Sequence, residues 1–197
     1  IYLSICIYDI NWFFCIINLF NFKLMNFPIL SSLILLPSIG ALFLLFSKDK
    51  NSNTSKYVSL FTSFVNFLIS IYLWYSFDTS ISSFQFVEDR EWMKGFINYK
   101  VGIDGISILF IILTTFITPL CIISVNNTVK NRLRDFLIAI LVMESLMIGV
   151  FCSLDLVIFY LFFEAGLIPM FLIIGIWGGE RRVYSAFKFF LYTLLGS

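Results

Sequence analysis

Histidine is absent from the 197-residue sequence, and cysteine is scarce. The four cysteines are too far apart to form any Cys-x-x-Cys pair: Cys6, Cys15, Cys121 and Cys152. Both facts argue against a zinc site, a c-type haem attachment and a disulfide framework, so we expect no metal site in this chain. No glycine-rich phosphate-binding loop follows a strand pattern, so we also expect no cofactor bound by this chain itself.

Charged residues are the second scarce class, at 13% of the sequence, and they nearly cancel, with 13 Lys plus Arg against 12 Asp plus Glu. A nucleic-acid-binding protein usually carries a basic patch, and a net charge of +1 provides none. We therefore expect no nucleic-acid partner. Apolar residues make up 60% of the chain, against roughly 45–50% in soluble domains, which is typical of a membrane protein.

Long apolar runs are what the sequence has in abundance. A helix needs about 20 apolar residues to cross a bilayer, and five runs meet or approach that length with at most one charge each. They predict an all-α fold, a polytopic transmembrane helix bundle with no repeat or linker dividing it. The runs are residues 28–46, 57–77, 106–125, 136–153 and 156–176, of which the last two form a tight transmembrane hairpin.

The two ends of the chain are less regular. Residues 183–197 begin a further apolar stretch that stops several residues short of a crossing, so we expect a fragment of a longer chain, truncated within this helix. Residues 1–24 are apolar but interrupted by Asp9 and three asparagines. They are either an extra helix or an extension outside the native product. Residues 25–197 are predicted to form one membrane domain.

The connections between the runs differ in charge. Residues 47–56, 126–135 and 177–182 are net basic, whereas residues 78–105 are net acidic. Because Lys and Arg favour the cytoplasmic or matrix side, the three basic connections are predicted on that side and residues 78–105 outside. Asp104, just before the run at 106–125, is predicted to be its N-cap.

Two glutamates lie inside the apolar runs. By helix rise, Glu144 and Glu164 fall at about the same depth, roughly 12 to 14 Å from the outer ends of adjacent helices. Ionisable groups inside a membrane are costly and often mark ion or proton pathways, which predicts a proton relay. The alternative is a pair of structural carboxyls, protonated and hydrogen-bonded across a helix interface.

Pro169 and Lys188 add to this hypothesis. Proline at 169 leaves the carbonyl of Ala165 without its helical donor, one residue from Glu164, so we expect a polar helix break beside the carboxylate. Lys188 lies five residues into the last apolar stretch. It either extends its ammonium to the membrane surface or serves as a charge partner in the relay.

Four stretches of sequence resemble a known family. They read VGIDGIS at 101–107, FYLFFEAGLIPM at 159–170, IGIWGG at 174–179 and KFFLYTLLGS at 188–197. Together they are similar to the N-terminal part of subunit 4 (chain M), the antiporter-like membrane subunit of proton-pumping NADH:quinone oxidoreductase, respiratory complex I. The alphaproteobacterial and plant mitochondrial forms are the most similar, and the likeness runs over residues 25–197.

The resemblance implies a role for each membrane charge. Glu164 occupies the position of the family's essential membrane carboxylate, and Lys188 matches the Lys-Phe-Phe motif. The resemblance gives less support to a role for Glu144. The family's central pumping lysine lies beyond Ser197. The implied localisation is the bacterial plasma membrane or the mitochondrial inner membrane.

Partners and cofactors follow from the same resemblance. The implied partners are the lipid bilayer and the other membrane-arm subunits of complex I, on which NADH, FMN, iron–sulfur clusters and quinone bind. This chain would then be a subunit of an enzyme without a redox site of its own, contributing a buried glutamate to proton translocation. Two alternatives remain open: a subunit of a multisubunit cation/proton antiporter, and a helical scaffold that transports nothing.

Overall fold

Helices account for most of the structure, a computed structural model that describes residues 28–46, 52–81, 83–93, 97–125, 129 and 132–197. The described elements follow one another as α3 (Ile29–Phe46), α4 (Ser52–Tyr75), β1 (Gln85–Met93), β2 (Ile97–Ile103), α5 (Gly105–Ser124), α6 (Leu133–Cys152), α7 (Leu156–Trp177) and α8 (Arg182–Gly196). Residues 1–24, the proposed extension or extra helix, lie outside the described residues.

Five of these helices are long and apolar enough to cross a bilayer: Ile29–Phe46, Thr54–Tyr75, Gly105–Ser124, Leu133–Cys152 and Leu156–Trp177. They coincide with the five predicted runs within a few residues, which confirms the helix-bundle prediction. Many large apolar side chains on their outer faces are exposed, such as Phe61 at 72% and Leu113 at 51%. The chain is therefore an integral membrane protein whose lipid-facing surface is apolar.

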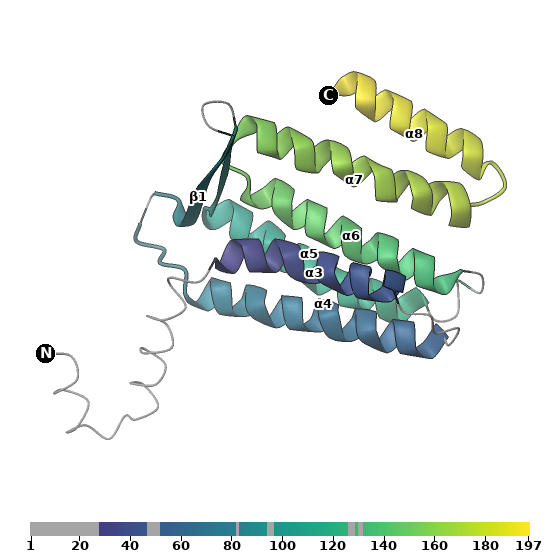
Figure 1. Ribbon diagram of the computed structural model, residues 1–197, viewed down its shortest axis with the longest axis horizontal. Helices are drawn as coiled ribbons and strands as arrows, with labels where there is room; N and C mark the ends of the chain where they lie inside the picture. Colours follow the sequence, from purple (N-terminus) through teal and green to yellow (C-terminus); the bar gives the residue numbers. More distant parts are fainter. Residues whose placement is uncertain (1–27, 47–51, 82, 94–96, 126–128, 130–131) are drawn as a thin grey trace, which may run out of the picture.

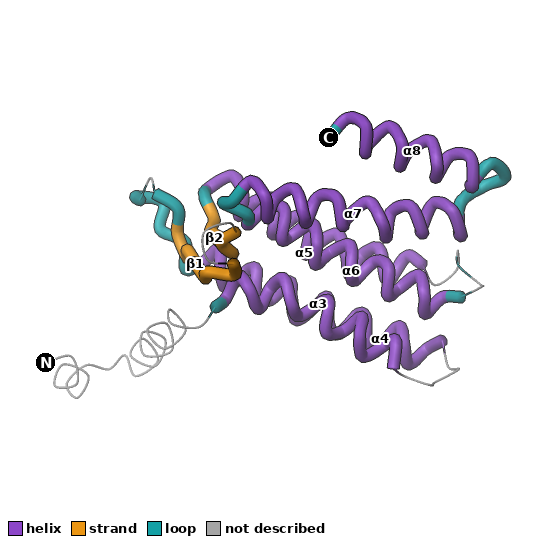
Figure 2. The backbone as a smooth tube through the Cα atoms, turned by 45° about the horizontal axis from the view of Figure 1, so that its top comes forward, coloured by secondary structure: helices purple, strands orange, loops and turns teal. Residues whose placement is uncertain are grey.

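The helices alternate in direction, and α8 packs on α7 at the edge of the bundle (Figure 1). The helix ends that border residues 47–56, 126–135 and 177–182 lie together, opposite the end that carries the two strands (Figure 2). This arrangement confirms that the three basic connections share one end of the bundle.

One element departs from the all-α prediction. Strands β1 and β2 pair antiparallel as a hairpin within residues 78–105, where the charge analysis had read only a connection. An extra residue in β1 between Gln85 and Glu88 makes a bulge, and Phe86 there has φ of 53°. The bulge shifts Glu88 relative to its partner strand, and its carboxylate then reaches α3.

Glu88 caps the first turn of α3. Its Oε1 accepts the backbone N–H of Leu30 at 2.9 Å, and its Oε2 accepts from the hydroxyl of Ser31. A carboxylate at a helix N-terminus satisfies free N–H groups and interacts favourably with the helix dipole. The other strand is tied to the α6–α7 turn, where Leu154 N–H donates to the carbonyl of Lys100 at 3.0 Å.

Aspartates begin two further helices. Asp104 Oδ1 accepts from the N–H groups of Ile106 and Ser107 at 3.2 and 2.7 Å, which confirms the predicted N-cap of α5. These hydrogen bonds hold the pKa of Asp104 below its ordinary value. Asp155 caps α7 in the same way, accepting from Val157 N–H at 2.8 Å. A cap immediately after α6 allows the chain to reverse within Ser153–Asp155.

Two apolar clusters fill the bundle, one at each end. The cluster near the hairpin contains Leu33, Ile111 and Ile148, and the cluster at the other end contains Leu44, Ile122 and Leu141. The helix positions between the two clusters carry buried polar groups, including Ser70, Thr115, Glu144 and Ser145. The bundle therefore has a polar layer at mid-height between two apolar layers.

Candidate functional site

Glu144 of α6 lies at the centre of the polar layer. It is only 2% exposed, and its Oε1 accepts a hydrogen bond from Asn66 Nδ2 of α4 at 2.9 Å. Neither Glu144 Oε2 nor Asn66 Oδ1, both fully buried, has a hydrogen-bond partner among the residues that the structure describes. A buried acceptor left unpaired costs about 1–3 kcal/mol, so these two oxygens mark a place where a donor belongs.

Hydroxyl groups from neighbouring helices complete the layer. Ser70 of α4 and Thr115 of α5 share a hydrogen bond of 2.8 Å. Ser145, next to Glu144, donates to the carbonyl of Ile34 at 2.5 Å and accepts from Ser38 at 2.8 Å. Ser38 follows Pro37, which has no N–H to donate within α3. These bonds tie α3, α4, α5 and α6 together around the carboxylate.

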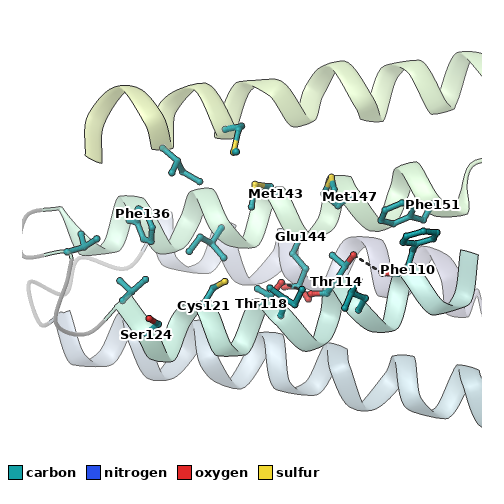
Figure 3. Close-up of a pocket in the computed structure, with 17 residues that line it drawn as sticks. Phe110, Thr114, Thr118, Cys121, Ser124, Phe136, Met143, Glu144, Met147 and Phe151 are labelled. Atoms are coloured by element: carbon teal, nitrogen blue, oxygen red, sulfur yellow. Dashed lines mark hydrogen bonds between the residues drawn. The ribbon is translucent and has the colours of Figure 1, made fainter. Parts of the chain in front are cut away.

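Glu144 also lines a pocket of about 630 Å³ between α5, α6 and α7 (Figure 3). The wall is mostly apolar, with Thr114, Thr118 and Cys121 of α5 adding polar groups. In Figure 3 the Glu144 side chain points from α6 toward the threonines of α5. Several α5 side chains on the wall are exposed, so the pocket reaches the outside of the bundle.

Glu164 lies on α7 with a different partner. Its Oε1 accepts a hydrogen bond of 2.7 Å from the hydroxyl of Ser197, just beyond the end of α8, and its side chain is half-buried. Pro169 is buried inside α7, five residues further along, so the carbonyl of Ala165 lacks its usual helical donor. The polar backbone group and the carboxylate share one turn of α7, which continues as a helix from Leu156 to Trp177.

Lys188 lies on α8 and is exposed on this chain. Its Nζ is 6.0 Å from the ring centroid of Tyr184 and 5.9 Å from that of Tyr192, one turn to either side. Both distances are at the limit of a cation–π contact. Within the described part of the chain, Lys188 forms no salt bridge, and neither does either membrane glutamate.

The predicted site residues therefore form two groups. Glu144 faces the interior of the α3–α6 bundle, whereas Glu164 faces α8 together with Ser197. In the described residues no hydrogen bond joins the two carboxylates. No group of three or more metal-ligating side chains was found there either.

Sequence reasoning missed Asn66 and the polar face to which it belongs. Ser55, Ser59, Ser63, Asn66 and Ser70 recur at three- and four-residue spacing along α4 and are all buried, at 2% exposure or less. That spacing puts them on one helix face, so a helical-wheel analysis of the run at 57–77 would have shown most of the pattern. The polar face was missed because only charged residues were counted within the apolar runs. Glu88 was missed because its partner, the start of α3, is remote in sequence.

The fold and this site define the class of protein: a polytopic helical membrane protein with a carboxyl group buried inside one of its spans. Comparisons with known proteins give the family. Residues 57–150 match the family described as "NADH-ubiquinone oxidoreductase chain 4, amino terminus", and residues 153–197 match "NADH:quinone oxidoreductase/Mrp antiporter, TM".

Curated relatives agree with these matches. The chain is 60% identical over 149 residues to NADH-quinone oxidoreductase subunit M of Rhodobacter capsulatus, covering 76% of this chain and 28% of that protein. It is 48% identical over 170 residues to NADH-ubiquinone oxidoreductase chain 4 of Marchantia polymorpha, covering 85% and 34%. The chain belongs to the subunit M/chain 4 family of NADH:quinone oxidoreductase and spans about a third of its relatives' length.

The fold recurs in a solved structure. A chain of the membrane-bound sulfane sulfur reductase, an archaeal respiratory membrane complex, aligns with a TM-score of 0.69 at 18% identity over 85% of this chain and 26% of that one. At this identity the likeness concerns the fold alone.

Proposed function

We propose that this chain is part of a membrane-arm subunit of NADH:quinone oxidoreductase and that Glu164 carries protons through it. The observation that carries the proposal is a carboxylate inside a membrane-spanning helix, within one turn of a proline-freed carbonyl, in a chain related to subunit M. A carboxyl group with polar neighbours in a membrane can bind and release a proton where water cannot pass freely.

Glu144 and Lys188 extend the proposed route. Glu144 supplies a second carboxyl at similar depth on the adjacent helix, and the pocket between α5, α6 and α7 gives it a connection to the outside of the bundle. Lys188 supplies a cation on α8, the helix that also places Ser197 against Glu164. The Lys188 ammonium would favour the ionised form of a carboxyl group that comes close to it.

The redox chemistry belongs to other subunits in this proposal. NADH, FMN, the iron–sulfur clusters and quinone are held there, and neighbouring membrane-arm subunits surround this chain. The cation/proton antiporter alternative retains one supporting observation, because the family matched by residues 153–197 includes Mrp antiporters in its description. Two curated relatives, at 60% and 48% identity, are named as oxidoreductase subunits, which favours the first assignment.

The experiment is a Glu164→Gln substitution in the full-length subunit within its assembled complex. Glutamine keeps the size and can still accept the bond from Ser197, but it cannot release a proton. We expect NADH:quinone turnover to fall at least about tenfold, a loss typical of removing a proton-transfer group. Electron transfer from NADH to an artificial acceptor should continue at the parental rate, because that step does not use this chain.

Glu180→Gln is the matched control. Glu180 is an exposed glutamate between α7 and α8, so its replacement should leave quinone turnover unchanged. The amount of assembled complex must be equal in all three proteins. Quinone turnover at the parental rate in assembled Glu164→Gln would contradict the proposal and favour the scaffold alternative. Cation/proton exchange that needs no NADH and is unaffected by the substitution would favour the antiporter alternative.

A further inference from the structure

Asn66 and Glu144 present two planar groups joined by a single hydrogen bond. The carboxamide donates from Nδ2 to Oε1 at 2.9 Å, while the second oxygen of each group, Asn66 Oδ1 and Glu144 Oε2, is buried and unpaired. Both unpaired atoms are acceptors when the carboxyl is ionised. A single donor hydrogen between them would satisfy both oxygens at once.

Within the described residues, the surroundings of Glu144 contain no compensating cation. Helices α3 and α5 carry no charged residue, and the nearest charge on α4 is Lys56, ten positions before Asn66. Of the other elements packed against α6, α7 carries Glu164, and Lys100 of β2 is bridged to Asp89 at 3.8 Å.

Helix α6 itself supplies no cation near Glu144, since its only other charged residues are Arg134 and Asp135 in the first turn. These groups are about 14 Å from Glu144 by helix rise, and each takes part in an ion pair at the surface. A bridging water molecule would satisfy the two orphaned oxygens but would leave a buried negative charge unpaired. A proton satisfies both oxygens and removes the charge.

We propose that Asn66 is the positioning residue of a proton-binding site in which Glu144 is held as a neutral acid. The proton resides on Glu144 Oε2 and is donated to Asn66 Oδ1, while Asn66 Nδ2 donates to Glu144 Oε1. The two side chains then form a cyclic carboxyl–carboxamide pair that binds one proton in the polar layer. On the route proposed above, this neutral pair is the state of Glu144 between two proton transfers. The pair itself forms whether or not the proton is passed on.

The geometry gives the first test. A high-resolution structure of the full-length subunit in its native complex at neutral pH should place Glu144 Oε2 within about 2.5–3.0 Å of Asn66 Oδ1, the distance of an O–H···O hydrogen bond. Two unprotonated oxygens do not approach so closely. A water or cation density between them, or a separation beyond about 3.5 Å, would overturn the proposal.

Infrared spectroscopy of the same complex gives a test that an ionised Glu144 would not pass. Glu144→Gln replaces the ring with an amide pair of the same shape, so the protein should fold while one protonated-carboxyl C=O band disappears from the difference spectrum. The exposed control Glu180→Gln should keep that band. Asn66→Ala should shift the band to higher frequency, since the carbonyl loses its donor. The proposal would be overturned if the band were unshifted in Asn66→Ala or still present in Glu144→Gln.

An isosteric exchange completes the experiment. In the double variant Asn66→Asp with Glu144→Gln, the acid moves to α4 and the amide to α6, and the ring keeps its size. The protonated-carboxyl band lost in Glu144→Gln should therefore return. If the band does not return in a folded double variant, Asn66 does not share the proton and the proposed pair is wrong.

Discussion

Single carboxylates at helix ends organise the hairpin side of this protein. Glu88 binds the first turn of α3 from a strand that begins 56 residues later in the sequence, and Asp104 and Asp155 begin α5 and α7. Each one satisfies backbone N–H groups that would otherwise be free at a helix start. Three acidic side chains outside the membrane-spanning segments therefore cap the starts of three membrane helices, and Glu88 also ties α3 to the hairpin.

Glu88→Ala tests the cap of α3. Losing the acceptor for Leu30 and Ser31 should destabilise the protein by about 0.5–2 kcal/mol, the usual range for a lost helix cap. Asp89→Ala is the control, because its ion pair with Lys100 is half-exposed and should contribute at most about 1 kcal/mol. Unfolding free energies of the two variants in detergent provide the measurement. Equal effects of the two substitutions would argue against the cap.

Asp104 makes stability dependent on acid pH. Its pKa is lowered in the folded protein by the N–H groups of Ser107 and Ile106, so its stabilising contribution is present above the ordinary aspartate pKa of about 3.9 and is lost as pH falls through the lower folded pKa. The parental protein should therefore exceed Asp104→Asn in unfolding temperature at neutral pH. The difference should shrink below about pH 4, and a constant difference down to the most acid pH tested would contradict it.

At the scale of elements, close helix contacts depend on glycine. A Cβ on Gly149 of α6 would lie 2.7 Å from Cδ1 of Phe162 on α7, whereas a Cβ on Gly166 of α7 would meet nothing within 4 Å. The absence of a side chain at 149 thus lets the two arms of the hairpin approach each other. Small residues at helix interfaces serve the same purpose in many membrane bundles.

Alanine at these two glycines should have opposite consequences. Gly149→Ala should destabilise the protein by about 1–3 kcal/mol, the usual cost of overpacking, because Phe162 must move. Gly166→Ala should be neutral or stabilising by up to about 1 kcal/mol, since alanine favours a helix and meets no neighbour. Unfolding free energies in mixed micelles measure both. A loss at Gly166→Ala equal to that at Gly149→Ala would refute this account of the hairpin.

The elements that the sequence predicted share one property: their signal is local. Apolar runs with at most one charge each predict the five spans, and the place of Asp104 before α5 predicts its cap. The Glu88 cap depends on a contact between distant segments, which no local pattern displays. The β-hairpin joins residues close in sequence, but its first strand is rich in charged residues and lacks a regular alternation of apolar and polar residues. The Asn66–Glu144 contact is intermediate, because the buried polar face of α4 has helical periodicity but its partner on α6 does not follow from it.

At the scale of the whole molecule, the alternating helices place residues 78–105 opposite the three basic connections (Figure 1). The charge distribution predicts that the hairpin end faces outside. In a cysteine-free background, Glu180→Cys should react with a membrane-impermeant reagent from the cytoplasmic or matrix side. Ser83→Cys should react from the other side. Labelling of both positions from one side would contradict the topology.

The polar layer between two apolar clusters is the feature of the whole bundle that transport would use. It holds Glu144 in the interior, while α7 holds Glu164 beside α8. Serine, threonine and asparagine side chains join helices in many membrane bundles, whereas a carboxyl group at mid-membrane is costly and usually serves transport. Of these two carboxyl groups, Glu164 is the one that we propose carries protons.

Proton translocation by the assembled complex tests that claim most directly. Inside-out membrane vesicles carrying Glu164→Gln should acidify their lumen on NADH addition at no more than about a tenth of the parental initial rate, the loss expected when a proton-transfer group is removed. Vesicles carrying Glu180→Gln, with the same amount of complex, should acidify at the parental rate. Parental acidification by assembled Glu164→Gln would show that this carboxylate moves no proton and would contradict the account.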